Sequence, residues 1–413
     1  MAIGGKYKKL LGVAGTEAGT TLMGLVSGVL IARHLGADGR GAVTAVMVTL
    51  TVLAWLVYLG VPNAAGYMSS KNRSSTVSVA AVLSAVLGAV AGIVLWFVAP
   101  WFADNYPAYV TTGLRVVAVL LPFVGVAYCS QEIAYAESRM HLWNLLRATP
   151  LVLPSIGVVV LALTGTLSVE SAIAVYLGSM VVYILVAIGL LIPRLSKSVA
   201  WGQSRVVFSY ALPRWASAAS DAVTARMDQV LMVVMSTPAE LGRYAVATTA
   251  VLVANPLSRA VGVMMYPDSR NADQASDLAL LHKKTRRRSV LLSTASGIVV
   301  IAIGAPFVGL VFGPEFEGLR PIMALLVLAG ILNDRYVVDI SYFAGIGKPE
   351  KLVRPSWITA IVALAGLVLL GRDGLTGIEA ASVALVCAAV RCVGLEIVTR
   401  RMYREPSVVV EGT

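Results

Sequence analysis

The chain has 413 residues, of which 58% are hydrophobic and only 13% are charged, and its mean hydropathy is +0.81. A soluble domain carries about 25% charged residues, so this composition excludes a soluble globular protein. The net charge of +11 would suit nucleic acid, but the positive residues lie in short loops between apolar segments, where they set membrane topology. We expect a polytopic membrane protein with no nucleic-acid partner.

Twelve apolar segments approach or exceed the length of about 20 residues that a helix needs to cross a bilayer. They cover roughly 10–33, 41–68, 76–102, 110–136, 143–164, 169–193, 206–235, 242–266, 289–312, 320–345, 352–371 and 375–399. The longest polar connections are 194–205 and 267–288, which leave no room for an inserted soluble domain. The sequence therefore predicts an all-α membrane protein.

Loop charges predict the orientation of the helices. With the N-terminus in the cytoplasm, the inside segments hold 22 Lys and Arg residues and the outside segments hold six. This asymmetry follows the positive-inside rule and places both termini in the cytoplasm. The run HKKTRRR at 282–288 is interpreted mainly as a topology signal, with a secondary role in binding anionic lipid headgroups.

Two short motifs indicate an internal duplication. GRGAV at 39–43 follows the first apolar segment, and GRYAV at 242–246 follows the seventh, 203 residues later. We expect two six-helix lobes, residues 1–198 and 199–413, related by a pseudo-two-fold axis along the membrane normal. Transporters built from such parallel repeats bind substrate between the lobes.

Signatures of enzymes and metal sites are missing from the sequence. The three cysteines lie inside apolar segments, and the three histidines are scattered without metal-ligand spacing. No phosphate-binding loop and no nucleophile–base grouping occurs. We therefore expect no catalytic residue, no metal and no cofactor.

Segment 206–235 carries four charged residues within its apolar sequence. Arg214, Asp221 and Asp228 are seven residues apart, so a helix places them on nearly the same face. Arg226 lies about 120–140° around the helix from that stripe. Charged residues inside a membrane usually serve function, although ion pairs that only hold helices together remain an alternative, and Arg214 is close enough to the helix end to snorkel.

Other segments add polar residues at membrane depth. Glu17 lies in the first segment, and Arg259 follows an Asn-Pro break in the eighth. Arg335 and Asp339 lie one turn apart in the tenth, where they either line a cavity or pair with each other. Three further charges are interpreted as packing contacts, namely Glu132, Arg391 and Glu396.

Arginine keeps its proton when buried and binds phosphate oxygens with a planar fork. The sequence therefore predicts a cavity for an anionic, phosphate-bearing substrate, with Arg214, Arg226, Arg259 and Arg335 as candidate ligands. Nearby carboxylates would carry H+ or Na+ or tune the arginines, and the candidates are Glu17, Asp221, Asp228 and Asp339.

Four stretches resemble one known family in the same order along the chain. They are ARHLGADGRGAV at 32–43, DQVLMVVMSTPAELGRYAVATTAV at 228–251, VFGPEFEGLRPIMALL at 311–326 and YFAGIGKPEK at 342–351. In these stretches the sequence resembles the Wzx-type lipid-linked oligosaccharide flippases. That family lies within the multidrug/oligosaccharidyl-lipid/polysaccharide exporter superfamily.

The resemblance implies a flippase of the bacterial plasma membrane that moves undecaprenyl-diphosphate-linked repeat units to the outer leaflet by alternating access. Its partners would be the lipid-linked oligosaccharide, membrane lipids and the polymerase and export machinery of a surface polysaccharide such as the O-antigen of lipopolysaccharide. Asp228 matches a recurrent family position, and Arg226 and Arg259 lie on helices where the family places cavity charges. The chain lacks the two extra C-terminal helices of the lipid II flippase branch, which disfavours that branch.

Other functions stay open at this stage. A cation-coupled multidrug antiporter of the same superfamily would favour an acidic cavity for organic cations, and the arginines speak against it. A membrane enzyme of polysaccharide assembly would show a large loop with catalytic residues. A non-transporting assembly partner would leave the cavity charges without a purpose.

Overall fold

The computed structural model describes residues 2–71, 74–196, 199, 201–252, 261–262, 265 and 275–404. These residues are helical almost throughout, and no β-strand occurs among them. Within the described chain, nine helices are long and apolar enough to cross a membrane. The structure confirms the predicted all-α, multi-pass membrane fold with about twelve spanning helices.

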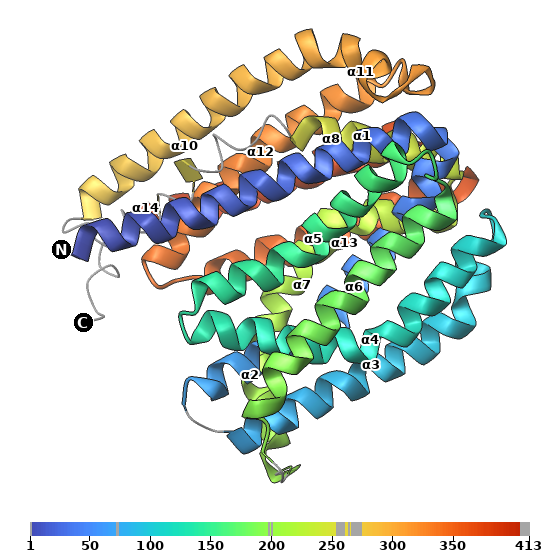
Figure 1. Ribbon diagram of the computed structural model, residues 1–413. Helices are drawn as coiled ribbons and strands as arrows, with labels where there is room; N and C mark the ends of the chain where they lie inside the picture. Colours follow the sequence, from blue (N-terminus) through green and yellow to red (C-terminus); the bar gives the residue numbers. More distant parts are fainter. Residues whose placement is uncertain are drawn as a thin grey trace. The chain divides into compact units, whose positions relative to one another are not determined.

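The helices follow one another with short connections (Figure 1). Their bounds are α1 Ala2–Leu56, α2 Val61–Ser69, α3 Ser74–Phe102, α4 Ala108–Ala136, α5 Met140–Leu163, α6 Val169–Leu191, α7 Ser204–Met235, α8 Pro238–Val251, α10 Ala275–Val299, α11 Ala305–Phe312, α12 Arg320–Gly345, α13 Glu350–Leu370 and α14 Gly377–Arg404.

The beginning of the chain agrees with the predicted break between helices 10–33 and 41–68. The element α1 consists of two helices that meet at Gly36, where the backbone is not helical, with φ 67° and ψ −170°. Glycine has no Cβ and adopts such a positive φ at little cost, so the first helix ends at this residue and the next one begins after it. The predicted second helix is wrong as one continuous element, because the chain breaks after Leu56 and α2 begins at Val61 after Gly60, with φ 74°.

The predicted polar loop at 267–288 is also wrong over its described part. α10 begins at Ala275, so the run HKKTRRR is helical rather than a connection. Lys and Arg are strong helix formers, and the helix places His282 and Thr285 of the run, with Ser289 after it, on one buried face. This helix therefore contributes both a basic surface and a polar stripe to the interior of the protein.

The chain forms two compact units. Unit 1 consists of Met1–Ala222 with Thr237–Gly242, and unit 2 of Val223–Ser236 with Arg243–Thr413. α7 therefore begins in unit 1 and ends in unit 2. The predicted division into lobes 1–198 and 199–413 stays a prediction.

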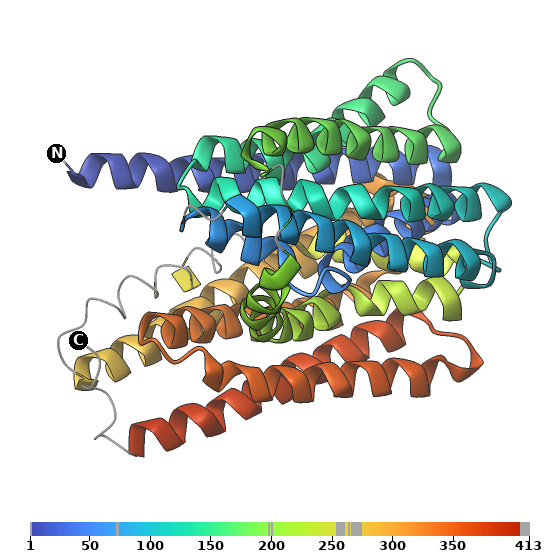
Figure 2. The same ribbon diagram turned by 90° about the horizontal axis from the view of Figure 1, so that it is seen from below.

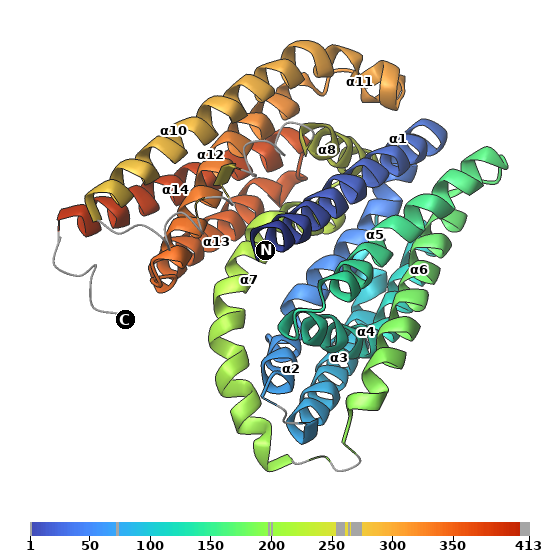
Figure 3. The same ribbon diagram turned by 60° about the vertical axis from the view of Figure 1, so that its left-hand side comes forward.

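In unit 1, α4 is the central helix and packs against α2, α3 and α6, with α1 and α5 also in contact. α3 and α4 run side by side in opposite directions and are joined by the loop 103–107 (Figure 2). In unit 2, α12 packs against both α10 and α14, and α13 packs against α14 (Figure 3). The arrangement around α12 places side chains from three helices around the same point.

The two repeated glycine motifs meet in unit 1. A Cβ atom added to Gly41 would lie 1.8 Å from the carbonyl oxygen of Pro238, and one added to Gly242 would lie 1.9 Å from that of Ala37. Both distances are far too short for any side chain. This close approach gives a steric reason for a glycine in each motif, whereas the duplication itself stays a prediction.

Candidate functional site

The four charged residues of α7 are divided between the two units. Arg214 is exposed and Asp221 is half-buried in unit 1, whereas Arg226 and Asp228 lie in unit 2. The predicted stripe Arg214–Asp221–Asp228 thus starts on one unit and ends on the other. In unit 1, Arg214 interacts electrostatically with Glu132, which also accepts a hydrogen bond from Asn63 Nδ2 at 2.7 Å.

Asp228 is held by hydrogen bonds on both carboxylate oxygens. The Tyr244 hydroxyl donates to Oδ2, and the Gln229 backbone N–H donates to Oδ1 at 2.7 Å. Arg226 donates to the Gln229 side-chain oxygen at 3.3 Å, and Gln229 Nε2 donates to Thr248 Oγ1 at 3.4 Å. These contacts tie the end of α7 to α8 and fix the orientation of the Arg226 guanidinium near the half-buried carboxylate of Asp228.

Arg391 joins three helices of unit 2. Its guanidinium carbon lies 4.4 Å from the ring centroid of Tyr336 on α12, and it donates to the hydroxyl of Thr224 on α7. A cation over an aromatic face is stabilised by the ring quadrupole, most strongly where water is excluded, and Arg391 is only 6% exposed. The contact fits the interpretation of Arg391 as a packing residue.

Asp339 is the centre of a second polar network, formed by α10, α12 and α14. The fully buried Asp339 Oδ1 accepts from Arg286 Nε at 2.6 Å and contacts His282 Nε2 at 2.9 Å. The other ring nitrogen of His282 contacts the Tyr403 hydroxyl at 2.7 Å, and the ring stacks on Tyr342 at 3.9 Å. A neutral imidazole with its proton on Nε2 satisfies both hydrogen bonds.

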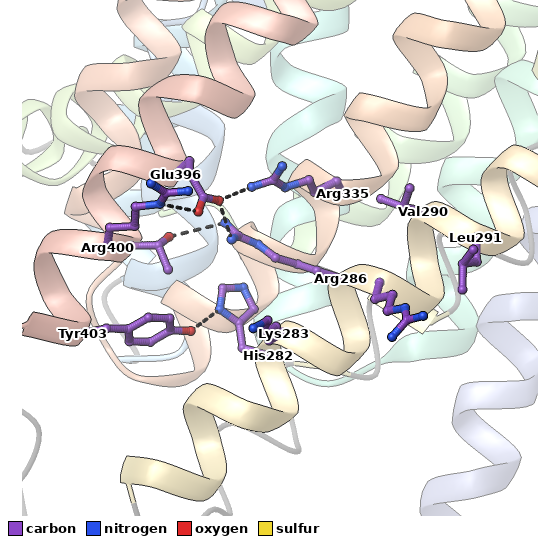
Figure 4. Close-up of a pocket in the computed structure, with 11 residues that line it drawn as sticks. His282, Lys283, Arg286, Val290, Leu291, Arg335, Glu396, Arg400 and Tyr403 are labelled. Atoms are coloured by element: carbon purple, nitrogen blue, oxygen red, sulfur yellow. Dashed lines mark hydrogen bonds and ion pairs between the residues drawn. The ribbon is translucent and has the colours of Figure 1, made fainter.

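Glu396 connects this network to Arg335 (Figure 4). Its carboxylate accepts from Arg286 at 3.0 Å, from Arg400 at 2.9 Å and from Arg335. The alternative that Arg335 and Asp339 pair within α12 is therefore not what the structure shows, because Asp339 bonds to α10 and Arg335 bonds to α14. The ion pairs of Glu396 with Arg286 and Arg335 join three helices, which fits the interpretation of Glu396 as a packing residue.

A cavity of about 580 Å³ opens beside this network (Figure 4). It is lined by His282, Lys283, Arg286, Arg287, Val290, Leu291, Arg335, Glu396, Thr399, Arg400 and Tyr403. All three elements that line it, α10, α12 and α14, belong to unit 2. The cavity is strongly basic, because five of these residues are Lys or Arg and one is a carboxylate.

Sequence reasoning placed two of the predicted residues, Arg335 and Asp339, at this network and missed its α10 side. From the sequence, His282 and Arg286 were interpreted only as part of the basic run that sets the membrane topology. The overlooked signal is a helical stripe, because His282, Ser289 and Ser293 are spaced by seven and four residues and are all buried.

Two predicted residues lie outside the structural description. Arg259 is not among the described residues, and the side chain of Glu17 is not described although its backbone belongs to α1. Within the described part of the chain, no three His, Cys, Asp or Glu side chains come together as a metal site would need.

The family model of polysaccharide biosynthesis proteins matches residues 30–321. The chain belongs to this family. No curated protein matches the sequence.

Solved structures with the same fold cover nearly the whole of this polysaccharide biosynthesis protein. The lipid II flippase MurJ in an inward closed conformation has a TM-score of 0.77 at 12% identity, covering 94% of this chain and 87% of that chain. An inward-facing multidrug resistance MATE family transporter of the MOP superfamily has a TM-score of 0.69 at 15% identity, covering 94% and 96%. A MOP superfamily transporter from Pyrococcus furiosus, described as having a binding pocket of reverse polarity, has a TM-score of 0.56 at 15% identity, covering 94% of both chains. The chain therefore has the fold of MOP superfamily transporters.

Proposed function

We propose that this protein is a flippase for lipid-linked oligosaccharides. It moves undecaprenyl-diphosphate-linked repeat units from the cytoplasmic to the outer leaflet of a bacterial plasma membrane, with both of its own termini in the cytoplasm. The observation that carries the proposal is the match to polysaccharide biosynthesis proteins over residues 30–321, in a chain with the transporter fold.

The charges inside the helices support an anionic substrate. Arg226 and Arg335 are only partly exposed, and each is oriented by a neighbouring side chain, Gln229 and Glu396 respectively. A guanidinium held in this way loses little conformational freedom when it binds a phosphate oxygen. We assign Arg214, Arg226, Arg259 and Arg335 to diphosphate and sugar binding.

The proposal includes coupling of transport to H+ or Na+ and contact with the polymerase and export machinery. The candidate coupling residues are Glu17, Asp221, Asp228 and Asp339. Carboxylates at membrane depth are costly to keep unless paired, and they recur in proton and ion pathways for that reason. Moving a lipid-linked oligosaccharide from one leaflet to the other needs no cofactor and no catalytic chemistry.

The direct test is reconstitution of the full chain in vesicles with a fluorescent undecaprenyl-diphosphate oligosaccharide in one leaflet. We expect the wild-type protein to make the label accessible to an external quencher, and Arg226→Ala to lower the initial rate at least about tenfold. The reason is that a charge-assisted hydrogen bond to phosphate contributes about 1.5–3 kcal/mol, and 1.4 kcal/mol is a factor of ten. Arg226→Lys keeps the charge and should retain part of the rate.

Folding is controlled by the elution profile and the abundance of each variant. A folded wild-type protein that leaves the label inaccessible would exclude the flippase. Proton- or sodium-driven efflux of an organic cation dye from the same vesicles would instead support the multidrug antiporter, whose fold the chain shares.

A further inference from the structure

The basic cavity of unit 2 is lined by residues of three helices. α10 and α14 contribute most of the lining, and α12, which packs against both, contributes Arg335. We propose that this cavity binds the phosphate group of a membrane lipid in the leaflet next to the N-terminal end of α10. The cavity shares Arg335 with the ligands proposed for the transported substrate, so the test uses Lys283 and Arg287, which the proposed function does not use.

The lining of the cavity carries positive charge that the protein does not neutralise itself. Five cationic side chains line the cavity, and the carboxylates of Glu396 and Asp339 balance two of them. Among the described residues, Lys283 and Arg287 have no ion-pair or hydrogen-bond partner. A cationic surplus this concentrated favours a ligand with one or two negative charges.

Arg335, in the lining of the cavity, has an unsatisfied hydrogen-bond donor. The Nε atom of Arg335 is buried and has no hydrogen-bond partner in the described structure, although its NH2 group is held by Glu396. A buried donor without a partner costs free energy, and a phosphate oxygen would satisfy it. Arg286 and Arg335 are already fixed by carboxylates, so the site is oriented before the ligand arrives.

The apolar part of the cavity lining favours a lipid over a free anion. Val290 and Leu291 line the same cavity immediately after the basic run, and Leu291 is 58% exposed. Farther along α10, Ile298 and Val299 are also exposed, so an apolar surface continues from the cavity toward the membrane interior. A ligand with a phosphate at one end and a hydrocarbon chain at the other matches this change from basic to apolar along one helix.

The α10 helix offers a matched pair of variants for the test. Lys283 and Arg287 line the cavity, whereas Lys284 and Arg288 do not, and all four of these residues are exposed. One residue step turns the side chain by about 100°, so the two pairs differ in direction but little in depth. The variants Lys283→Gln/Arg287→Gln and Lys284→Gln/Arg288→Gln remove equal charge from almost the same level of the membrane.

The measurement is native mass spectrometry of the purified full chain titrated with phosphatidylglycerol, with phosphatidylcholine as the zwitterionic comparison. We expect phosphatidylglycerol to bind in preference to phosphatidylcholine. The Lys283→Gln/Arg287→Gln variant should weaken its apparent affinity about tenfold or more, and the Lys284→Gln/Arg288→Gln variant should change it less than about threefold. Equal losses in both pairs, or no preference over phosphatidylcholine, would overturn the proposal.

Two competitors identify the source of the phosphate. Displacement of phosphatidylglycerol by undecaprenyl phosphate assigns the site to a polyprenyl lipid, and its failure assigns the site to a phospholipid; both outcomes support a lipid phosphate. Displacement of phosphatidylglycerol by inorganic phosphate at the same concentration would contradict the role of the apolar residues Val290 and Leu291. If the double variant does not fold, Arg287→Gln against Arg288→Gln makes the same comparison, with an expected loss of about threefold.

Discussion

In unit 1, helices approach one another through glycines. A Cβ atom added to Gly88 on α3 would lie 2.6 Å from the carbonyl oxygen of Leu121 on α4, and one added to Gly92 would lie 2.3 Å from that of Ala118. In unit 2, α10, α12 and α14 are joined by charged side chains, with Asp339 fully buried at the centre. The lipid environment explains why both solutions occur, because apolar side chains gain nothing by leaving lipid for one another.

The difference teaches where this protein can bind a charged ligand. Close backbone packing, as between α3 and α4, leaves no space for a ligand at the contact, whereas an ion-pair network with more cations than carboxylates leaves positive charge that a ligand can neutralise. Unit 2 holds the cavity of about 580 Å³ with five Lys or Arg residues. Unit 1 holds a cavity of about 330 Å³ at residues 138–142, with Arg139 as its one Lys or Arg residue.

The largest expected effect is the removal of the central carboxylate of unit 2. Asp339→Ala leaves Arg286 without its closest partner and removes a hydrogen bond from His282. Removing one member of a buried ion pair costs about 3–5 kcal/mol, because the remaining charge stays desolvated. We expect a large drop in the melting temperature of the purified protein, measured by dye-monitored thermal unfolding.

The control for this prediction is an exposed member of the same network. Arg400 is 72% exposed and pairs with Glu396 one turn away, so Arg400→Ala should cost less than about 1 kcal/mol. Comparable losses for the two variants would show that unit 2 does not depend on the buried carboxylate.

The second prediction breaks the glycine packing of unit 1. The atoms nearest to an added Cβ at Gly88 are all backbone atoms of Leu121 and Pro122, so Gly88→Val forces α3 and α4 apart. Overpacking of this kind costs about 1–3 kcal/mol. We expect lower yield of monodisperse protein on size-exclusion chromatography and a lower melting temperature.

Gly178 in α6 provides the matched control. It is exposed and an added Cβ would meet nothing within 4 Å, so Gly178→Val should behave like the wild-type protein. An equal loss in both variants would mean that valine in a spanning helix, rather than the contact between α3 and α4, causes the defect.

Helix type and number were predictable because long apolar segments have few alternatives in a membrane. The errors arose where composition and local geometry disagree. The break after Leu56 falls inside an apolar stretch, so hydropathy carries no sign of it, and α10 extends into a strongly basic run that reads as a loop. Both errors concern where a helix begins or ends, and neither changes the class of the fold.

The candidate site was predictable by residue type but not by partner. Arg335 and Asp339 were identified from their charge and depth, yet their partners His282, Arg286 and Glu396 come from distant segments. Spacing along one helix cannot reveal contacts between helices. The charged residues of α7 illustrate the same limit, because one helix supplies side chains to both units.

The smallest expected effect concerns an ion pair at the edge of unit 1. Glu137, in the loop after α4, accepts from Arg194 and from Ser69 at 2.8 Å, and Arg139 Nε lies 3.3 Å from its other oxygen. Partial burial raises the pKa of this carboxyl, but the hydrogen bonds and the two positive charges outweigh burial and hold the pKa below its ordinary value of 4.5.

A lowered pKa means that the folded state favours the ionised carboxylate, so the stabilisation is complete above pH 4.5 and is lost as the pH falls through the folded-state pKa. Glu137→Gln should therefore be less stable than the wild-type protein by at most about 1 kcal/mol at pH 7, because the pair is partly exposed. The difference in melting temperature should shrink toward zero as the pH falls below 4.5 and through the lowered pKa of Glu137. In an Arg194→Gln background the same substitution should show a smaller pH dependence. A difference that stays constant over this range would show that Glu137 contributes through packing and not through its charge.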